Sequence, residues 1–537
     1  MTRHTKLRQT LPALLFVSVL VTTGCGDEEK PTPTPGGTSP TPRLSGKLRY
    51  ESVPYDHSSN GLDYANIVSH PIRGARVLLL DAANDAILAE TASSKDGTYA
   101  FDWTGSPSVK IWVHAETTEP HIVIADNTTQ NAKYVLESAE IVADGPQTLD
   151  MLASTGWTGN SYGNERQSAP FVILDAAYSA ARRFIDEALP APVFPKLEIN
   201  WSVENRPEDG DVNAGQIGTS HWDGNEIYVL GKADVDTDEF DTHVIVHEWG
   251  HSYEDFMSRS DSQGGSHGFG DVLDPRLAFS EGFCTALSAM ILEPDTVYSD
   301  SMGLQQKDGF WEDVDDNDTS MAAKPGWYSE TTIENIVFDL YDDDKNGSET
   351  FDKVSLGLGG IHAAMVGGFK TTSAMTSLFP LVATLKANHA DAVGDIDSLV
   401  VHHGNGSSFG IDPVVDEWGT NETHGGDDPN AIPVYVGMKI GESKTITLVG
   451  GLDWALLGQN RFLRFTGSGS SVSVSTSSID DVDLYVYRRG TEVASSVTTS
   501  GQESVQFSAT AGDEYVINVQ GFGEFSGSYD VIVDVLP

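Results

Sequence analysis

The sequence has few cysteines and few basic residues for its length. Its 537 residues include 2 cysteines, Cys25 and Cys284, which excludes the class of small exported domains held together by several disulfides. Lysine and arginine number 32 against 79 aspartate and glutamate residues, so the formal net charge is −47. That charge repels phosphate backbones, and we expect no binding of nucleic acid. The acidity also suits solubility in salt-rich surroundings, or sites for calcium.

Long apolar runs are also scarce. Leu11–Val21, which follows three basic residues, is too short for a membrane-spanning helix and has the pattern of an export signal. The next residues, Thr-Thr-Gly-Cys at 22–25, resemble the processing site of bacterial lipoproteins. That resemblance implies that Cys25 carries lipid and that the exported protein contacts a membrane through this anchor alone. Ordinary signal cleavage followed by secretion is the alternative.

The rest of the chain changes in composition along its length, which predicts a multidomain monomer with an α+β core flanked by two all-β sandwich modules. The expected divisions are a lipoprotein-type signal peptide at 1–25, a Pro/Thr-rich linker at 26–43, a β-sandwich at 44–150, a mixed domain at 151–425, a linker at 426–433 and a second β-sandwich at 434–537. The helices expected in the mixed domain are Ala169–Leu189, His243–Met257, Ala278–Ile291, Thr331–Tyr341 and Thr372–Asn388.

Both flanking regions resemble accessory modules. Pro71–Leu80, followed by Lys95–Phe101, resembles the transthyretin-like sandwich of the carboxypeptidase-regulatory type, in which a Gly-Ala strand and an Asp-Gly turn recur. Asp481–Tyr487 and the later segments 511–519 and 527–533 resemble the bacterial pre-peptidase C-terminal domain, which commonly trails secreted peptidases. Because such modules are accessory, we assign no chemistry to them.

The mixed domain contains the motif His-Glu-x-x-His at 247–251. On a helix, His247 and His251 lie one turn apart on the same face, so both imidazoles can reach one zinc ion. Glu248 can then serve as the general base toward a water at the open zinc position. The acidic residues at 236–239 are expected to cap this helix and fill its first turn. The alternative is a pair of core histidines in a hydrogen-bonded network.

A third ligand is needed, and Glu281 is the best candidate because it is an early carboxylate in a second, apolar helix. Together these residues resemble the gluzincin metallopeptidases, in which two histidines of the motif and a glutamate from a following helix bind zinc. The gap to Glu281 is closest to that of the fungalysin-like members. The family places an aspartate where this chain has Thr285, so the outer contacts of the site must differ, with Asp255 as one substitute.

The gluzincin resemblance also implies a substrate-binding edge strand and an oxyanion donor. The strand expected at Glu226–Leu230 would pair with an extended peptide. Tyr328 and His362 are the candidate catalytic donors for the oxyanion, and each has an equally simple structural explanation. His389, His402 and His403 are fainter options.

Two acidic segments suggest calcium. Asp342, Asp344 and Asn346 match the opening of a calcium loop, although Lys353 stands where an EF-hand has its glutamate. A second cluster lies at 313–318. A solvated acidic loop explains both segments equally well.

We therefore expect an exported zinc metallopeptidase that hydrolyses peptide bonds in a peptide or protein substrate. The rival is a non-catalytic adhesion or scaffold protein of the cell surface with a structural or relic metal site. The intact Glu248 argues against this rival, because a structural zinc site needs no base.

Overall fold

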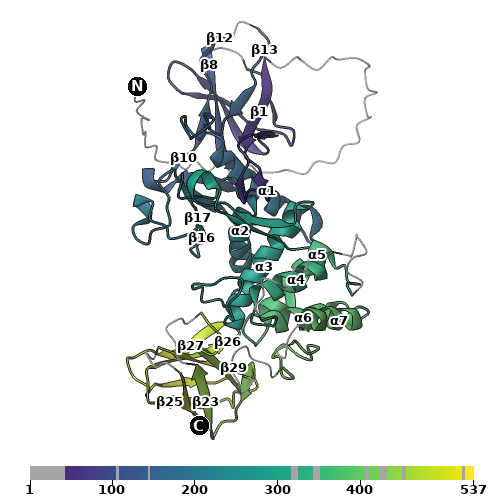
Figure 1. Ribbon diagram of the computed structural model, residues 1–537, viewed down its shortest axis with the longest axis vertical. Coiled ribbons are helices and arrows are strands. Elements are labelled where there is room, and N and C mark those ends of the chain that lie inside the picture. Colours follow the sequence, from purple (N-terminus) through teal and green to yellow (C-terminus); the bar gives the residue numbers. More distant parts are fainter. Residues whose placement is uncertain are drawn as a thin grey trace, which may run out of the picture. The chain divides into compact units, whose positions relative to one another are not determined.

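The computed structural model describes residues 43–103, 108–142, 145–315, 324–342, 351–404, 410–422, 432–449, 455–522 and 527–537. The expected signal peptide, almost all of the first linker, Cys25, Asp344 and Asn346 lie outside these residues. Residues 42–537 form one compact unit. Within the described part the chain is a mixed α/β protein with seven α-helices and several β-sheets (Figure 1). No described helix is both long and apolar enough to cross a membrane.

The N-terminal strands form two sheets. In β8, Val109, Ile111 and Val113 are fully buried and alternate with partly exposed residues, so this strand turns one face to the core. The ten-stranded sheet has the order β16-β17-β15-β9-β8-β5-β6, with β10 paired to β9 and both β11 and β12 paired to β8. Its strands are β5 (Ala75–Asp81), β6 (Ile87–Ala92), β8 (Ser108–Thr117), β9 (Ile122–Asp126), β10 (Ala132–Lys133), β11 (Val135–Glu137), β12 (Ile141–Val142), β15 (Leu197–Trp201), β16 (His221–Trp222) and β17 (Ile227–Val229).

The smaller of the two sheets is built around β1, which pairs with four short strands. Its members are β1 (Leu44–Ser52), β4 (Val68–Pro71), β7 (Thr98–Phe101), β13 (Gln147–Thr148) and β14 (Met151–Ala153). Three two-stranded ribbons lie outside these sheets, namely β2 (Tyr55–Asp56) with β3 (Gly61–Leu62), β18 (Gly231–Lys232) with β19 (Asp236–Thr237), and β20 (Val297–Asp300) with β21 (Phe310–Asp313).

The ten-stranded sheet contains strands from both sides of the boundary that we placed at 150. β15 runs parallel to β9, with Ile199 opposite Ile124, and parallel to β17 on its other side. One continuous hydrophobic core includes residues from Leu44 to Ala455. The N-terminal β-region and the mixed region therefore share hydrogen bonds and a core.

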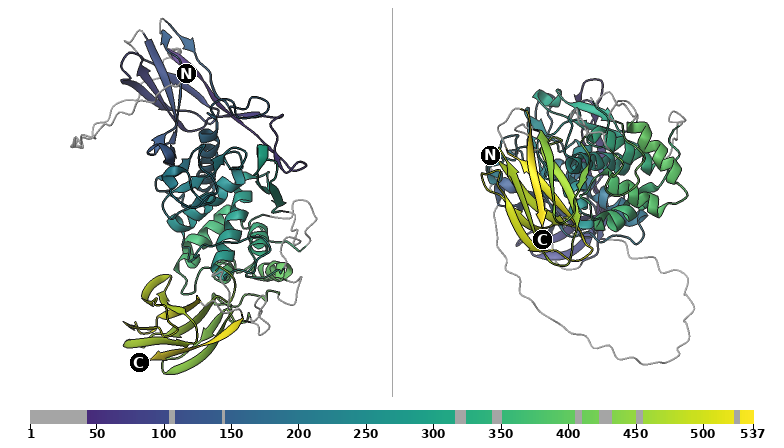
Figure 2. Two further views of the ribbon diagram at one scale, coloured as in Figure 1. Left: turned by 60° about the vertical axis from the view of Figure 1, so that its left-hand side comes forward. Right: turned by 90° about the horizontal axis from the view of Figure 1, so that it is seen from below.

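The helices are α1 (Ala169–Glu187), α2 (Thr242–Met257), α3 (Pro275–Leu292), α4 (Glu330–Tyr341), α5 (Gly357–Ala364), α6 (Leu378–Asn388) and α7 (Val393–Gly404). Helix α1 packs against strands β8 and β9, α2 packs against β16 and β17, and the other helices pack mainly on one another (Figures 1 and 2). In α3, every residue from Pro275 to Ile291 is buried, as expected for a helix that is apolar all round. Pro275 occupies its first turn, and the Asp274 side chain accepts a hydrogen bond from the backbone N–H of Arg276.

Two helix starts differ from the expectation. The segment expected to be helical from Thr372 becomes helical only at Leu378, because the Thr372 hydroxyl accepts from the Ala374 N–H and satisfies the backbone locally. The acidic residues before α2 do not cap it. The helix begins at Thr242, and Asp236 belongs to strand β19.

The C-terminal strands form two sheets that share a separate core. One has the order β22-β24-β29-β26-β27 and the other β23-β30-β25-β28. Their bounds are β22 (Tyr435–Gly437), β23 (Glu442–Val449), β24 (Asn460–Thr466), β25 (Ser471–Ser478), β26 (Val482–Arg488), β27 (Thr491–Ser496), β28 (Ser504–Ser508), β29 (Glu514–Gly521) and β30 (Ser528–Leu536). This region contacts the start of α3, since Leu273 bridges to Leu456 and the Arg276 guanidinium lies 4.9 Å from the Phe462 ring centroid.

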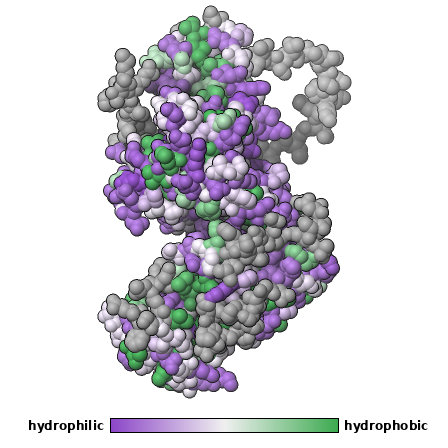
Figure 3. All heavy atoms as spheres, viewed as in Figure 1, coloured by the Kyte–Doolittle hydropathy of each residue, from purple (hydrophilic) through white to green (hydrophobic). Residues whose placement is uncertain are grey.

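Hydrophilic residues predominate on the face shown in Figure 3. Acidic residues outnumber basic ones 79 to 32 in the chain, so the protein carries a large negative charge.

Candidate metal centre

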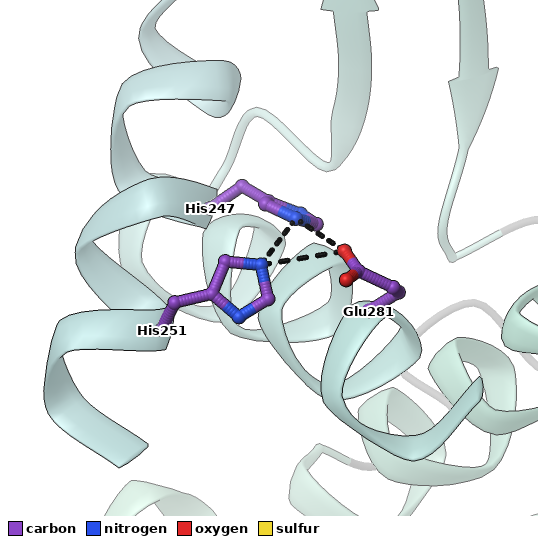
Figure 4. Close-up of side chains that lie close together, drawn as sticks. All are labelled: His247, His251 and Glu281. Atoms are coloured by element: carbon purple, nitrogen blue, oxygen red, sulfur yellow. Dashed lines mark hydrogen bonds and ion pairs between the residues drawn. The ribbon is translucent and has the colours of Figure 1, made fainter. Parts of the chain in front are cut away.

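Two helices bring the motif histidines and Glu281 together (Figure 4). His247 and His251 project from the same face of α2, and their Nε2 atoms lie 3.1 Å apart. Glu281 enters from α3, with Oε2 3.1 Å from His247 Nε2 and 3.3 Å from His251 Nε2. Three donor atoms thus face one point, and these atoms are of the kinds that zinc accepts.

The close approach of α2 and α3 depends on Gly250. A Cβ atom at this position would lie 2.9 Å from the Cys284 Sγ and 3.1 Å from the Cys284 Cβ, which is too close for an ordinary contact. Gly250 lies between the two motif histidines, so its missing side chain lets the ligand-bearing turn of α2 rest directly on α3. Cys284 is fully buried, burial raises the pKa of its thiol, and its Sγ lies 3.4 Å from His251 Nδ1.

Polar side chains hold the outer nitrogens of both imidazole rings. Thr285 Oγ1 lies 3.1 Å from His247 Nδ1. Ser280 Oγ lies 3.2 Å from His251 Nδ1, and Glu254 Oε2 lies 3.6 Å from the same nitrogen. These contacts orient the rings and leave each Nε2 directed at Glu281. Thr285 therefore contacts the histidine from the position where the resembling family has an aspartate.

The proposed substitute, Asp255, has a different partner. Its Oδ2 accepts a hydrogen bond of 2.6 Å from Trp222 Nε1. The sequence offered no signal for Ser280 or Glu254 as partners of His251, because both are ordinary helical residues until the helices pack.

Glu248 lies beside the ligands without joining them. Its Oε2 accepts a hydrogen bond of 2.9 Å from the backbone N–H of Trp222 in β16. The side chain is 9% exposed and lines the same cavity as His247, His251 and Glu281. This placement fits a carboxylate that exchanges a proton in the cavity rather than one that coordinates the metal.

The charges of the centre are balanced internally. Burial alone would raise the pKa of Glu281, but the positive charge on His251 and hydrogen bonds from His247 and His251 hold this pKa well below its usual range. Burial opposes the charge on His251, yet Cys284 and Glu281 raise its pKa well above the ordinary value. This ion pair describes the metal-free centre, and the imidazole of His251 would have to give up its proton for a metal ion to bind.

A cavity of about 790 Å³ opens over the centre. Its walls come from distant segments, since His221 and Trp222 belong to β16, Tyr298 belongs to β20, and the Gly/Ser-rich loop 260–269 covers another side. This size suits several residues of an extended chain rather than a single small ion.

The structure places the expected oxyanion donors elsewhere. Tyr328 is fully buried, and its hydroxyl lies 3.4 Å from the carbonyl of Pro325. His362 Nδ1 lies 2.9 Å from the Tyr253 hydroxyl, inside the helical core. Neither side chain is among the residues that line the cavity over the centre. Among the fainter options, His403 is buried against Asp339, with 2.6 Å between Nε2 and Oδ2.

The cavity contains other polar groups that the sequence reasoning missed. His267 Nε2 lies 3.5 Å from Glu281 Oε2, and its Nδ1 lies 2.9 Å from Glu330 Oε2. Burial lowers the pKa of His267, but the hydrogen bond to Glu330 and the charge of Glu281 outweigh it and raise this pKa to about 9. The only signal in the sequence was a histidine within a Gly/Ser-rich loop near the motif.

Of the expected calcium residues, Asp342 is described and follows the C-terminal end of α4. Asp344 and Asn346 lie outside the described residues, so the calcium loop stays a prediction.

Comparisons with known proteins give little similarity. Neither the protein-family models nor the curated proteins match this chain. Among solved structures, 19% of the chain is similar to the pre-peptidase C-terminal domain of collagenase from Bacillus anthracis, covering 93% of that chain at 13% identity and a TM-score of 0.16. The same share is similar to PliG, a periplasmic lysozyme inhibitor from Aeromonas hydrophila, covering 96% of that chain at 11% identity and a TM-score of 0.14. At these TM-scores neither likeness supports a functional argument.

Proposed function

We propose that the protein is a zinc-dependent peptidase, with a gluzincin-type α+β core between an N-terminal β-region and a C-terminal module of the pre-peptidase type. The observation that carries this proposal is the convergence of His247 Nε2, His251 Nε2 and Glu281 Oε2 within 3.3 Å of one another, with Glu248 beside them. A structural zinc site is closed by protein ligands and has no use for a carboxylate at its open side.

The residues divide the work between metal binding and proton transfer. His247, His251 and Glu281 would hold zinc, which supplies Lewis acidity and lowers the pKa of a water bound to it. Glu248 takes a proton from the attacking water and delivers it to the leaving amine. The Trp222 N–H fixes one oxygen of Glu248, so the carboxylate keeps its direction toward the cavity during the reaction.

The substrate is a peptide that binds in extended form. β17 is paired on both sides, with β15 and β16, so it is not the open edge that the sequence suggested. The edge strand is β16, which lines the cavity through His221 and Trp222. A peptide strand added along β16 would pass directly over Glu248.

His267 and Tyr298 replace Tyr328 and His362 as candidates for the oxyanion donor. Both line the cavity, and the Tyr298 ring centroid lies 6.0 Å from that of His247. A donor in this position stabilises the negative charge that develops on the carbonyl oxygen.

We further propose that the protein is exported and that lipid on Cys25 anchors it to the cell envelope. The support is the sequence pattern at 22–25. A Cys25→Ser protein that still incorporates labelled palmitate would overturn this attachment.

The test of the enzyme proposal compares Glu248→Gln with the wild type and with Glu226→Gln. Glu226 accepts a hydrogen bond from Asn200 outside the cavity and so controls for the loss of a carboxylate. Zinc content, casein hydrolysis and thermal midpoint are measured on the same preparations.

We expect Glu248→Gln to keep zinc and its thermal midpoint but to lose about 10²-fold or more in rate, because the amide cannot accept the proton. Glu226→Gln should match the wild type. An active, zinc-loaded Glu248→Gln protein would refute the mechanism, and a wild type that binds zinc without any hydrolysis would favour the scaffold alternative.

A further inference from the structure

A second group of acidic side chains lies in the wall of the same cavity. Asp236 and Asp238 come from the segment between β18 and α2, and Asp300 is the last residue of β20. One carboxylate oxygen from each lies within 4.8 Å of the others. A backbone bridge between Asp236 and Met302 holds the two segments together. The group shares no residue with the zinc ligands.

The carboxylates of this group are incompletely satisfied, with Asp238 buried and Asp236 and Asp300 half-buried. Asp238 is 3% exposed, and Asp241, at the start of α2, is 1% exposed. In each of Asp236, Asp238, Asp241 and Asp300, the Oδ1 atom has no hydrogen-bond partner. Among the described residues, no lysine, arginine or histidine nitrogen lies within ion-pair distance of any of the four.

A buried carboxylate without a compensating charge is costly, and four together add mutual repulsion. Burial and the charge of Asp300 raise the pKa of Asp236 to about 7, and burial raises the pKa of Asp300 to about 6. Two of the four carboxylates accept a hydrogen bond from a hydroxyl, since Ser220 Oγ donates to Asp238 and Ser301 Oγ donates to Asp241. Hydroxyl donors satisfy single oxygens but supply no positive charge, so without a cation the raised pKa values favour protonation within the group.

We propose that Asp236, Asp238 and Asp300 bind a calcium ion. The donors are all oxygens, which suits a hard cation and separates this site from the nitrogen-containing donor set of the histidines. Calcium accepts irregular arrangements of six to eight oxygens, so carboxylates from two separate segments can serve it, with backbone carbonyls or water completing the shell.

The bound ion would link the segment before α2 to β20. That strand carries Tyr298, which forms part of the cavity wall beside His247. Calcium would therefore stabilise the fold and fix this wall of the cavity, whatever reaction takes place there.

The experiment titrates the full-length, calcium-depleted and zinc-loaded protein with calcium chloride by calorimetry and follows the thermal midpoint. The variants are Asp238→Asn and Asp300→Asn, each of which removes one charge with little change in volume. Asp255→Asn is the matched control, because Asp255 lines the same cavity outside the acidic group. His251→Ala, which is titrated without added zinc, tests independence from the zinc site.

We expect the wild type, Asp255→Asn and His251→Ala to bind calcium at this site and to gain thermal stability from it. Asp238→Asn and Asp300→Asn should bind one equivalent less, or bind it at least about ten-fold more weakly, and their calcium-dependent gain should shrink. Without calcium, both variants should be at least as stable as the wild type, since each loses a carboxyl group that is costly to ionise in this place.

The proposal would be overturned if Asp238→Asn and Asp300→Asn bound calcium with the stoichiometry and affinity of the wild type and gained the same thermal stability from it. Because none of these readouts measures hydrolysis, an inactive protein would leave this test intact.

Discussion

Replacing Gly250 by alanine tests whether the contact between α2 and α3 positions the metal ligands. The new Cβ would meet the Cys284 side chain at 2.9 and 3.1 Å, so one of the two helices must shift by a few tenths of an ångström. Alanine favours the helix by about 1 kcal/mol relative to glycine. Overpacking a core costs about 1–3 kcal/mol, and we expect it to win here because Cys284 is fully buried and cannot move aside.

The predicted net effect of Gly250→Ala is a loss of up to about 2 kcal/mol in the free energy of unfolding. Zinc affinity should fall as well, because the added methyl separates His247 and His251 from Glu281. Cys284→Ala creates space at the same place, so the double variant should recover much of the loss. The expected coupling energy between the two sites is about 1 kcal/mol or more.

Urea denaturation of the wild type, both single variants and the double variant supplies the four free energies of the cycle, and competition with a chelator supplies the zinc affinities. Substitutions at Gly250 and Cys284 leave His247, His251 and Glu281 unchanged, so a change in zinc affinity would report on the contact between α2 and α3. Additive effects in the double variant, or a Gly250→Ala protein more stable than the wild type, would refute the role assigned to this contact.

Two further predictions address the surroundings of the site. Thr285→Val removes the hydroxyl that lies 3.1 Å from His247 Nδ1 while keeping the shape of the side chain. Zinc affinity, measured by competition with a chelator, should fall about 10-fold to 100-fold. An unchanged affinity would show that Thr285 does not orient the ring. Glu312 is a buried acid whose pKa is raised to about 8 by burial and by the charge of Glu330. Its folded-state pKa lies above the unfolded value, so the free energy of unfolding should fall as the pH rises from about 5 to 8. Glu312→Gln should make the free energy of unfolding less dependent on pH over this range. An identical pH dependence in the variant would contradict the raised pKa of Glu312.

The arrangement of the His-Glu-x-x-His motif could be predicted from the sequence because its geometry is local. The spacing of His247 and His251 places both rings on one face of any helix, and the apolar residues between and around them make that helix a buried one. Glu281 could be proposed as the third ligand because a lone carboxylate in an apolar helix is unusual. The helices α1 to α4 follow from the same periodicity, to within a few residues at their ends.

Tertiary structure alone decided the surroundings of these residues. Thr285, Ser280 and Glu254 become partners of the histidines only through the packing of α2 on α3, which Gly250 permits. Tyr328 and His362 seemed suitable in the chain, yet packing buries both inside the helical core.

The cavity and the acidic group were equally beyond the reach of sequence patterns. In the sequence, Asp236 and Asp238 have the pattern of a helix cap, and only the fold brings Asp300 of β20 beside them. Likewise, β16 is the edge strand of the ten-stranded sheet only because β15 pairs with β9 in that sheet. Periodicity reports which face of an element is apolar, a property of neighbours along the chain. The pairing of distant strands and the approach of two helices depend on side chains far apart in sequence, so they are fixed only when the whole core packs.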